Sequence, residues 1–383
     1  MEGSDWKLST KATKEAVAIC VQARMPALVW GGPGTGKTTF IGQLGKYLGE
    51  EVETIIASIR EPSDFGGLPV ISNGGGVRLE PPVWAHRLAE RGRGILFIDE
   101  INTAPPAVQA ALLRVIQEGA AGDIVLPKAV ARIAAANPTD IAAGGWELAA
   151  PLANRFIHFD WPRNTAAWID GMIEGFDSDF RPPILPKDWE DQIPAMQSLV
   201  ASYIQHRTDM LYIFPDSEER SGRAWPSPRT WDYAATLLAA CRAAGGTVEH
   251  EILLLAGAVG DAPAGEFQIW LNELDLPNPE DLLSKPSSFK GMVKGKLGRS
   301  DKMFACLSSV TTAVLNDLTD DRWKAAWQIL ATAASESKTP DVAAFAAKAL
   351  AKRLSPELTM PTAELKEFLP ILREAGLLTD LNE

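Results

Sequence analysis

Cysteine and histidine are scarce in this sequence, and neither residue type is spaced for metal binding. The cysteines are Cys20, Cys241 and Cys306. They stand far apart, which excludes the paired spacing of zinc and redox motifs, and their scatter suits a reducing cytoplasm. The four histidines are also isolated from one another, which predicts structural or surface roles for them.

Long apolar runs and an excess of cations are missing as well. No run reaches the length of a membrane span, and the first ten residues are polar and mixed in charge, so neither a span nor a signal peptide is predicted. The 37 Lys and Arg against 49 Asp and Glu give a net charge of −12. This charge argues against a chain-wide surface for nucleic-acid phosphates, but it does not exclude a local basic pore. With 383 residues, 46% of them hydrophobic, the chain can form two or three globular domains.

A glycine-rich segment after an apolar run, residues 27–30, has the spacing of a phosphate-binding loop. Gly31, Gly36, Lys37 and Thr38 match G-x-x-x-x-G-K-[ST], and a helical pattern begins at Lys37. Glycines let backbone N–H groups approach a phosphate, and the helix directs its positive end to the same anion. We expect Lys37 to reach the β- and γ-phosphates of ATP and the Thr38 hydroxyl to ligate Mg²⁺. The other predicted nucleotide-binding residues of this loop are Gly32, Pro33, Gly34, Thr35 and Thr39.

Hydrolysis also needs carboxylates, and two of them follow residues 95–98. Four consecutive apolar residues there predict a strand buried on both faces. Asp99 is predicted to hold Mg²⁺, directly or through water, and Glu100 to orient and polarise the attacking water. Asn137 follows another predicted strand, 129–136, where its amide can bond the γ-phosphate and that water. Each motif also has a non-functional interpretation. Residues 31–38 can be an ordinary glycine-rich turn, Asp99 and Glu100 an acidic strand end, and Asn137 the start of an Asn-Pro turn.

Strand and helix patterns alternate through the N-terminal part of the chain. Strands are predicted at 27–30, 52–59, 95–98, 129–136 and 156–159, and helices at 12–24, 37–48 and around Val108 to Ile116. This alternation predicts an α/β fold, a mainly parallel sheet between helices with nucleotide at the carboxyl ends of its strands. After residue 160 helical patterns dominate, at 164–176, 229–244, 250–259 and beyond 266, with an irregular connection at 177–194.

The excursion between the second strand and Asp99, residues 60–94, predicts a projecting β-hairpin. Two short apolar runs within 68–80 flank the cluster Asn73-Gly74-Gly75-Gly76. A second hairpin is predicted within 119–135, around Gly122. Either hairpin is a candidate contact for a partner or a surface loop with no partner.

Together these motifs resemble those of AAA+ ATPases and, among them, the MoxR family. Residues 31–38, 95–100 and Asn137 stand in the order of Walker A, Walker B and sensor 1. Residues 62–67 resemble the segment before the family's inserted element. The resemblance implies that Arg155, in the segment Leu152-Ala153-Asn154-Arg155-Phe156, is an arginine finger, and that Arg229, in Ser227-Pro228-Arg229, is the sensor 2 residue, acting in cis or in trans. As lone arginines, both can also be merely structural or solvated.

The resemblance also implies a domain organisation. It places an αβα nucleotide-binding domain at 1–162 with an insert at 60–94, an α-helical lid at 163–299 and a C-terminal helical extension at 300–383. The sequence departs from the family in two places: the insert is predicted as a hairpin rather than a helix-containing element, and residues 300–383 match no family motif.

The function implied by the resemblance is that of a cytoplasmic homo-oligomer, expected to be a ring hexamer, that uses ATP and Mg²⁺ to remodel or activate a protein partner. Such partners are often von Willebrand factor A-domain proteins. One alternative is a DNA-acting motor, which the pI near 5.0 and the lack of basic–aromatic interleaving disfavour. Another is a nucleotide-gated scaffold with little turnover, which Glu100 disfavours.

Overall fold

The fold is described from a computed structural model of the chain, over residues 10–72, 74–138, 145–161, 164–174, 180–336, 341–353, 358–359, 362–366 and 368–374. The chain forms two compact units, the first from Met1–Glu190 and Leu211–Gly265, the second from Asp191–Met210 and Glu266–Glu383. The predicted lid, 163–299, contributes to both units. The domain boundaries after residues 162 and 299 stay predictions.

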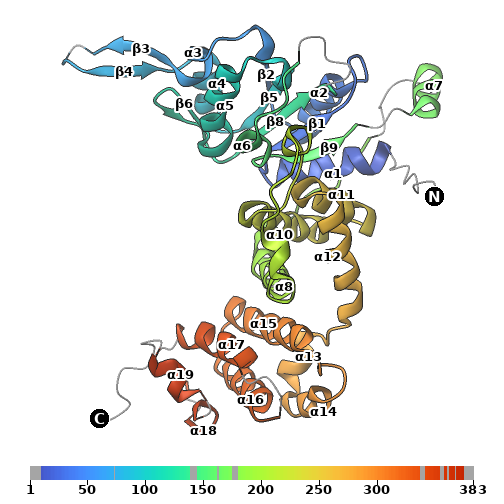
Figure 1. The fold of residues 1–383 in the computed structure, drawn as a ribbon, viewed down its shortest axis with the longest axis vertical. Helices are drawn as coiled ribbons and strands as arrows, with labels where there is room; N and C mark the ends of the chain where they lie inside the picture. Colours follow the sequence, from blue (N-terminus) through green and yellow to red (C-terminus); the bar gives the residue numbers. More distant parts are fainter. Residues whose placement is uncertain are drawn as a thin grey trace. The chain divides into compact units, whose positions relative to one another are not determined.

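The first unit contains a parallel sheet. Among the described residues its five strands lie in the order β2-β5-β8-β1-β9 (Figure 1). Their bounds are Ala27–Trp30 for β1, Val52–Ile56 for β2, Gly94–Asp99 for β5, Val130–Ala136 for β8 and Ile157–Asp160 for β9. The predicted strands are thus confirmed, except that β2 is shorter than expected because a 3₁₀ turn, η1 (Ala57–Ile59), follows it.

Helices cover both faces of the sheet. Leu96 and Ile98 of β5 pack in one buried cluster with Leu88 of α4 (Val83–Arg91) and Leu112 of α5 (Pro106–Glu118). On the other face, α2 (Lys37–Leu48) approaches closely at Gly45, where a Cβ atom would lie 2.5 Å from Val52 Cγ2. Helix α1 (Thr10–Gln22) contacts β8 and β9 on that face. The predicted α/β class with a sheet between helices is therefore confirmed.

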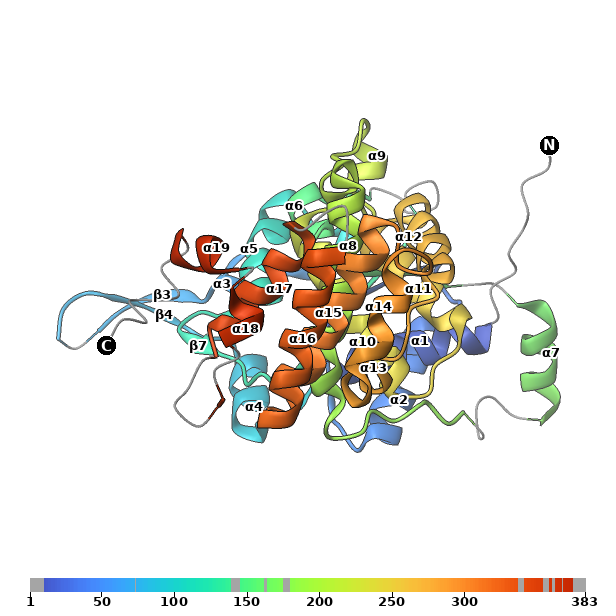
Figure 2. The ribbon, with the colours of Figure 1, turned by 90° about the horizontal axis from the view of Figure 1, so that it is seen from below.

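The insert forms the predicted hairpin and more. Strands β3 (Leu68–Ile71) and β4 (Val77–Glu80) pair antiparallel and extend away from the sheet in both ribbon views (Figures 1 and 2). Asn73, at the predicted tip, lies outside the described residues. The insert also contains α3 (Ser63–Gly66) and α4, so the expectation of a hairpin in place of a helix-containing element was wrong. The apolar side chains of α4 at positions 84, 85 and 88 had the spacing that predicts a helix.

The second predicted hairpin is smaller than expected. Strands β6 (Ala120–Ala121) and β7 (Ile124–Val125) pair around Gly122, whereas residues from Val130 onward belong to β8 of the main sheet. The hydrogen bonds of that long strand are made with β1 and β5.

The rest of the first unit is helical. Helix α11 packs against α1 and β9, and α10 begins with a capping box in which Ser227 and Thr230 exchange hydrogen bonds. Trp225 and Trp231 are buried packing residues. The bounds are Ala150–Ala153 for α6, Thr165–Glu174 for α7, Glu218–Ser221 for α9, Pro228–Ala243 for α10, Val248–Val259 for α11 and Asp261–Leu274 for α12, which continues into the second unit.

The second unit is helical throughout its described part, with Trp323, Trp327 and Phe289 in its core. Helix α8 begins within the region predicted to be irregular. None of the described helices of the chain combines the length and apolar character that crossing a membrane needs. The bounds are Ile193–His206 for α8, Pro279–Ser284 for α13, Lys290–Val293 for α14, Ser300–Asn316 for α15, Asp320–Glu336 for α16, Asp341–Ala351 for α17, Thr362–Leu365 for α18 and Leu369–Glu374 for α19.

Candidate functional site

The loop between β1 and α2 is held in one conformation by its glycines and by Trp161. Gly34 and Gly36 have φ values of +72° and +90°, in the left-handed region that favours glycine. The Trp161 indole N–H donates to the Thr35 carbonyl at 3.0 Å. At Gly31 a Cβ atom would lie 2.9 Å from Trp161 Cβ, so this position also needs glycine. Contacts within the chain therefore hold the loop in this conformation.

Lys37 lies inside this loop and is nearly buried. Its Nζ donates to the carbonyls of Gly31 at 2.5 Å and Gly32 at 3.0 Å, and to Asn137 Oδ1 at 3.3 Å. Burial lowers the pKa of Lys37, while the negative charges of Asp99 and Glu100 oppose that shift. The loop carbonyls thus hold a cation at the place where phosphates would enter.

The two predicted carboxylates lie at the end of β5. The Thr38 hydroxyl donates to Asp99 Oδ2 at 2.9 Å, which links the start of α2 to β5. Glu100 has a φ of +57°, a left-handed conformation that costs a non-glycine residue free energy. Its Oε2 accepts from the Ser58 hydroxyl at 2.6 Å, so its carboxylate is oriented by the turn that follows β2.

Asn137 is fixed by a second asparagine. Asn102, fully buried in the turn η2 (Ile101–Thr103), donates its Nδ2 to the Asn137 carbonyl at 2.7 Å and accepts from the Asn137 N–H at 3.1 Å. The turn after Glu100 therefore sets the backbone that carries the Asn137 amide.

These residues surround a single cavity of about 290 Å³, lined by residues 33–39, Asp99, Glu100 and Asn137. It lies at the carboxyl ends of β1, β5 and β8, where the sequence placed it. Gly31 and Gly32 of the predicted set contact the Lys37 ammonium through their carbonyls. A larger cavity of about 660 Å³ lies in the second unit and contains no predicted residue.

The donor set fits a nucleotide with a hard metal ion. The Thr38 hydroxyl and the Asp99 carboxylate supply the oxygen ligands that Mg²⁺ prefers, one or two from the protein with the rest from phosphates and water. The described residues contain no group of three or more His, Cys, Asp or Glu that could hold a metal ion. When bound with ATP, Mg²⁺ neutralises charge on the phosphates.

Arg155 and Arg229 do not line this cavity. Arg155 donates to the Gln117 amide oxygen and the Pro151 carbonyl, and Arg229 donates to Asn154 Oδ1 at 3.4 Å. Burial lowers the pKa of Arg155, and the charge of Arg229 lowers it further, because the two guanidinium groups are close. Neither forms an ion pair with a carboxylate of the described residues. The structure thus separates both arginines from the cavity of their own chain.

Sequence reasoning missed three residues of the site: Ser58, Asn102 and Trp161. Ser58 follows β2 and Trp161 follows β9, so both lie at the edge where the other strands supply site residues. A search for polar residues at every strand end would have found Ser58. The role of Asn102 depends on a tertiary contact and had no local signal.

The comparison with family models agrees with this geometry. Residues 26–158 match the model of the ATPase family associated with various cellular activities (AAA). A search of the curated proteins finds no match. The solved structures that match include an ATPase candidate from Cytophaga hutchinsonii, 16% identical with a TM-score of 0.38, covering 66% of this chain and 84% of that chain. They also include a full-length MCM homolog from Methanopyrus kandleri, 15% identical with a TM-score of 0.35, covering 68% of this chain and 57% of the other. The family match thus supports an AAA ATPase domain within residues 26–158.

Proposed function

We propose that the chain is a ring-forming ATPase of the MoxR type that couples ATP binding and hydrolysis to the remodelling or activation of a protein partner. One observation carries the proposal: Lys37, Thr38, Asp99, Glu100 and Asn137 meet in one cavity, while Arg155 lies outside it. None of the described residues that line this cavity is an arginine, so in our proposal a neighbouring subunit supplies the arginine that completes the site.

Each residue of the cavity has a part in hydrolysis. Lys37 and the loop N–H groups bind the phosphates, and Thr38 and Asp99 hold Mg²⁺. Glu100 orients and polarises the attacking water, with its carboxylate positioned by Ser58. Asn137 donates its amide to the γ-phosphate or that water.

The arginines outside the cavity support assembly into a ring. Burial raises the pKa of Tyr233 of α10, and the positive charges of Arg229, Arg132 and Arg155 oppose that shift, so the three guanidinium groups lie in the same region as this phenol. No ion pair in the described structure neutralises any of the three. A cluster of this kind can stabilise an anion supplied from outside, and the γ-phosphate on a neighbouring subunit is that anion in our proposal.

The hairpin of the insert supports a protein partner rather than DNA. Its side chains Ile71 and Val77 are 85% and 70% exposed, which suits apolar contacts with a protein. Its Arg78 pairs with Glu80 at 2.9 Å, so its cation is already neutralised. A DNA-gripping hairpin needs several free cations, because each neutralised phosphate adds affinity through counterion release. A von Willebrand factor A-domain protein is the partner class we propose, and the free cysteines suit a cytoplasmic location.

Subunit mixing tests the proposal. Arg155→Ala and Lys37→Ala proteins are each expected to be inactive in ATP hydrolysis, since an arginine finger contributes about 10³–10⁵-fold in rate. A 1:1 mixture should recover up to about one quarter of wild-type turnover, because that share of head-to-tail interfaces pairs an intact P-loop with an intact Arg155. A mixture no more active than its parts, with assembly intact by light scattering, would overturn the trans role. Stimulation of turnover by DNA would instead favour the motor alternative.

A further inference from the structure

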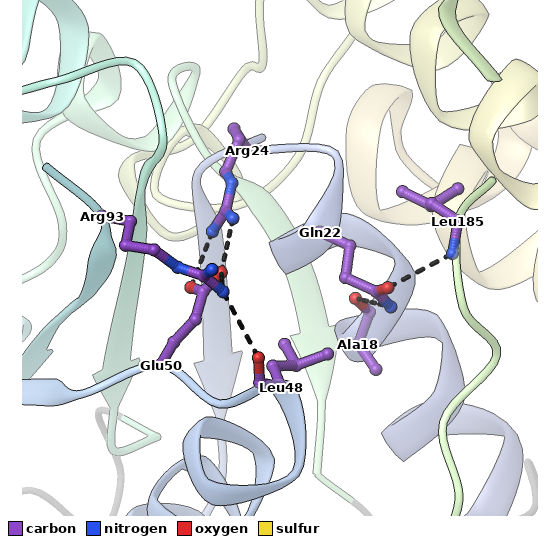
Figure 3. Close-up of polar contacts among 7 residues, drawn as sticks. All are labelled: Ala18, Gln22, Arg24, Leu48, Glu50, Arg93 and Leu185. Atoms are coloured by element: carbon purple, nitrogen blue, oxygen red, sulfur yellow. Dashed lines mark hydrogen bonds and ion pairs between the residues drawn. The ribbon is translucent and has the colours of Figure 1, made fainter. Parts of the chain in front are cut away.

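The amino-terminal edge of the sheet in the first unit carries another cavity, of about 400 Å³. Three turns meet there: Arg24 precedes β1, Glu50 precedes β2 and Arg93 precedes β5. Parallel strands begin at one edge of a sheet and end at the other, so this cavity lies at the opposite edge from the candidate ATP site. Figure 3 shows the polar contacts at this edge.

Two arginines share one carboxylate in these turns. Glu50, whose side chain is 3% exposed, accepts from Arg24 through both terminal nitrogens, at 2.6 and 2.9 Å (Figure 3). Arg93 donates to the same carboxylate at 3.2 Å and to the Leu48 carbonyl at 3.4 Å. Arg24 has a φ of +59°, so the backbone is held in an unfavourable conformation where it presents this guanidinium. One negative charge thus faces two positive ones.

The segment from Pro183 to Lys187, called the strap below, forms the other wall of the cavity. Gln22 of α1 holds it, donating to the Pro183 carbonyl at 2.8 Å and accepting from the Leu185 N–H at 3.2 Å (Figure 3 shows the Leu185 contact). Lys187 of this strap lines the cavity and has no ion-pair partner among the described residues. The cavity therefore has three cations, Arg24, Arg93 and Lys187, against the single carboxylate of Glu50.

The remaining lining is aromatic and aliphatic. Tyr47 of α2 is 40% exposed and Ile184 of the strap is 55% exposed, and Trp189 also lines the cavity. A concave site with apolar walls and a few converging charged groups is the usual composition of a small-ligand pocket, and 400 Å³ is within the size range of such pockets. The surplus of cations is notable in a chain whose net charge is −12.

We propose that this cavity binds a small organic anion. The carboxylate or phosphate group of the ligand is held by Arg93 and Lys187, on the side of the cavity where Arg24 lies. An apolar or aromatic part of the ligand packs on Tyr47 and Ile184. Guanidinium groups bind both headgroups through paired N–H donors. Arg93 is the main specific donor, because its side chain is 57% exposed and Glu50 engages only one of its nitrogens. The site is distinct from the nucleotide cavity and needs no ATP hydrolysis to be detected.

Calorimetric titration with two ring-matched probes tests the proposal and separates the two headgroups. Phthalate carries carboxylates, phenyl phosphate carries a phosphate, and benzyl alcohol is the neutral control. The full-length Lys37→Ala protein is used, so that the P-loop does not bind the phosphate probe. At least one anionic probe should bind at millimolar concentration or better, and benzyl alcohol should not.

Charge variants then locate the binding. The double variant Arg93→Gln/Lys187→Gln should weaken binding about 10-fold or more, because it removes charge-assisted hydrogen bonds. Arg91→Gln is the matched control, since Arg91 pairs with Glu51 at 2.6 Å and does not line the cavity. Glu50→Gln, if folded by circular dichroism, should strengthen binding. Failure of both anions to bind, equal binding to the double variant, or weaker binding to Glu50→Gln would each overturn the proposal.

Discussion

The two edges of the sheet are built from similar elements but differ in the sign of the charge that is in excess. At the carboxyl edge, Lys37 is held by loop carbonyls, and the carboxylates of Asp99 and Glu100 are in excess. At the amino edge, Glu50 is saturated by arginines and cations are in excess. The first edge has the donors that a metal ion with phosphates needs, whereas the second has the donors that an anion needs. Charge balance, rather than the number of polar residues, distinguishes them.

Both edges also contain a residue in the left-handed conformation that is not glycine. Glu100 has a φ of +57° at one edge and Arg24 a φ of +59° at the other; in the described chain the remaining example is Asp275. Such backbone costs about 1–3 kcal/mol and persists where surrounding contacts over-determine it. At both edges the charged side chain of that residue is bonded to a residue from a different turn, Ser58 for Glu100 and Glu50 for Arg24.

The largest expected difference between the edges is in ATP turnover. Glu100→Gln should lower turnover by about 10²–10⁴-fold, because the amide cannot accept a proton from water, and it should leave ATP binding intact. Arg91→Gln, at the amino edge, should leave turnover unchanged, since Arg91 is part of an exposed ion pair with Glu51. Phosphate release and binding of a fluorescent ATP analogue measure the two quantities. Wild-type turnover by the Glu100→Gln protein would mean that the water is activated elsewhere.

Acid should weaken the sheet that carries both edges. His158 of β9 accepts from Trp30 Nε1 at 2.9 Å and contacts the Ala153 carbonyl at 3.0 Å through its other nitrogen, so its neutral form is bonded at both ends. Burial lowers the pKa of His158 to about 4. The unfolded chain takes up a proton near pH 6.5 and the folded chain does not until about pH 4, so stability falls as pH decreases through this window.

The expected loss is about 3 kcal/mol, at 1.36 kcal/mol for each unit of difference in pKa. Urea unfolding at several pH values between 7 and 4 measures this loss in the free energy of unfolding. The same series with the His158→Gln variant gives the pH dependence that the Asp and Glu carboxylates contribute without His158. A wild-type dependence on pH no steeper than that of the variant would show that the pKa of His158 is not lowered in the folded state.

A smaller effect on turnover is expected at a residue that only positions the carboxyl edge. Asn102→Ala removes both hydrogen bonds to the Asn137 backbone, and misplacement of a catalytic group by about 1 Å can cost on the order of 10²-fold. We expect a fall of kcat by about 10- to 10²-fold with little change in KM. Gln109→Ala is the control, because Gln109 is a buried amide that bonds Ala104 and Ala149 away from the cavity. An equal fall in kcat for both variants would indicate a general loss of stability.

The residues at the two edges differ in how far they could be predicted from the sequence. The fold class, the main strands and the meeting of residues 33–39, 99, 100 and 137 in one cavity were predictable, because a phosphate-binding motif is contiguous in the sequence and the strand ends of a parallel sheet share an edge. Asn102 was not, since it acts through two tertiary hydrogen bonds to the Asn137 backbone, and for Ser58 the only signal was its position after a strand. Arg24, Glu50 and Arg93 come from three separate turns, and each alone has the pattern of an ordinary surface residue. Helix α4 was missed because the hairpin signal beside it was stronger.

The smallest expected effect concerns the stability of the amino edge. Glu50→Gln leaves two guanidinium groups around a neutral amide, and hydrogen bonds to charged groups contribute about 1.5–3 kcal/mol. Because Arg24 is 28% and Arg93 57% exposed, water compensates in part, and we expect a loss of about 1–2 kcal/mol rather than the 3–5 kcal/mol of a fully buried pair. The adjacent Glu51→Gln is the matched control. Glu51 is 69% exposed and pairs with Arg91, so its loss should cost less than about 1 kcal/mol. Urea midpoints of the two variants at neutral pH measure the difference. If the two variants lose the same free energy of unfolding, the carboxylate that Arg24 and Arg93 share has no special role in stability. The difference in charge balance between the edges would then not contribute to the stability of the amino edge.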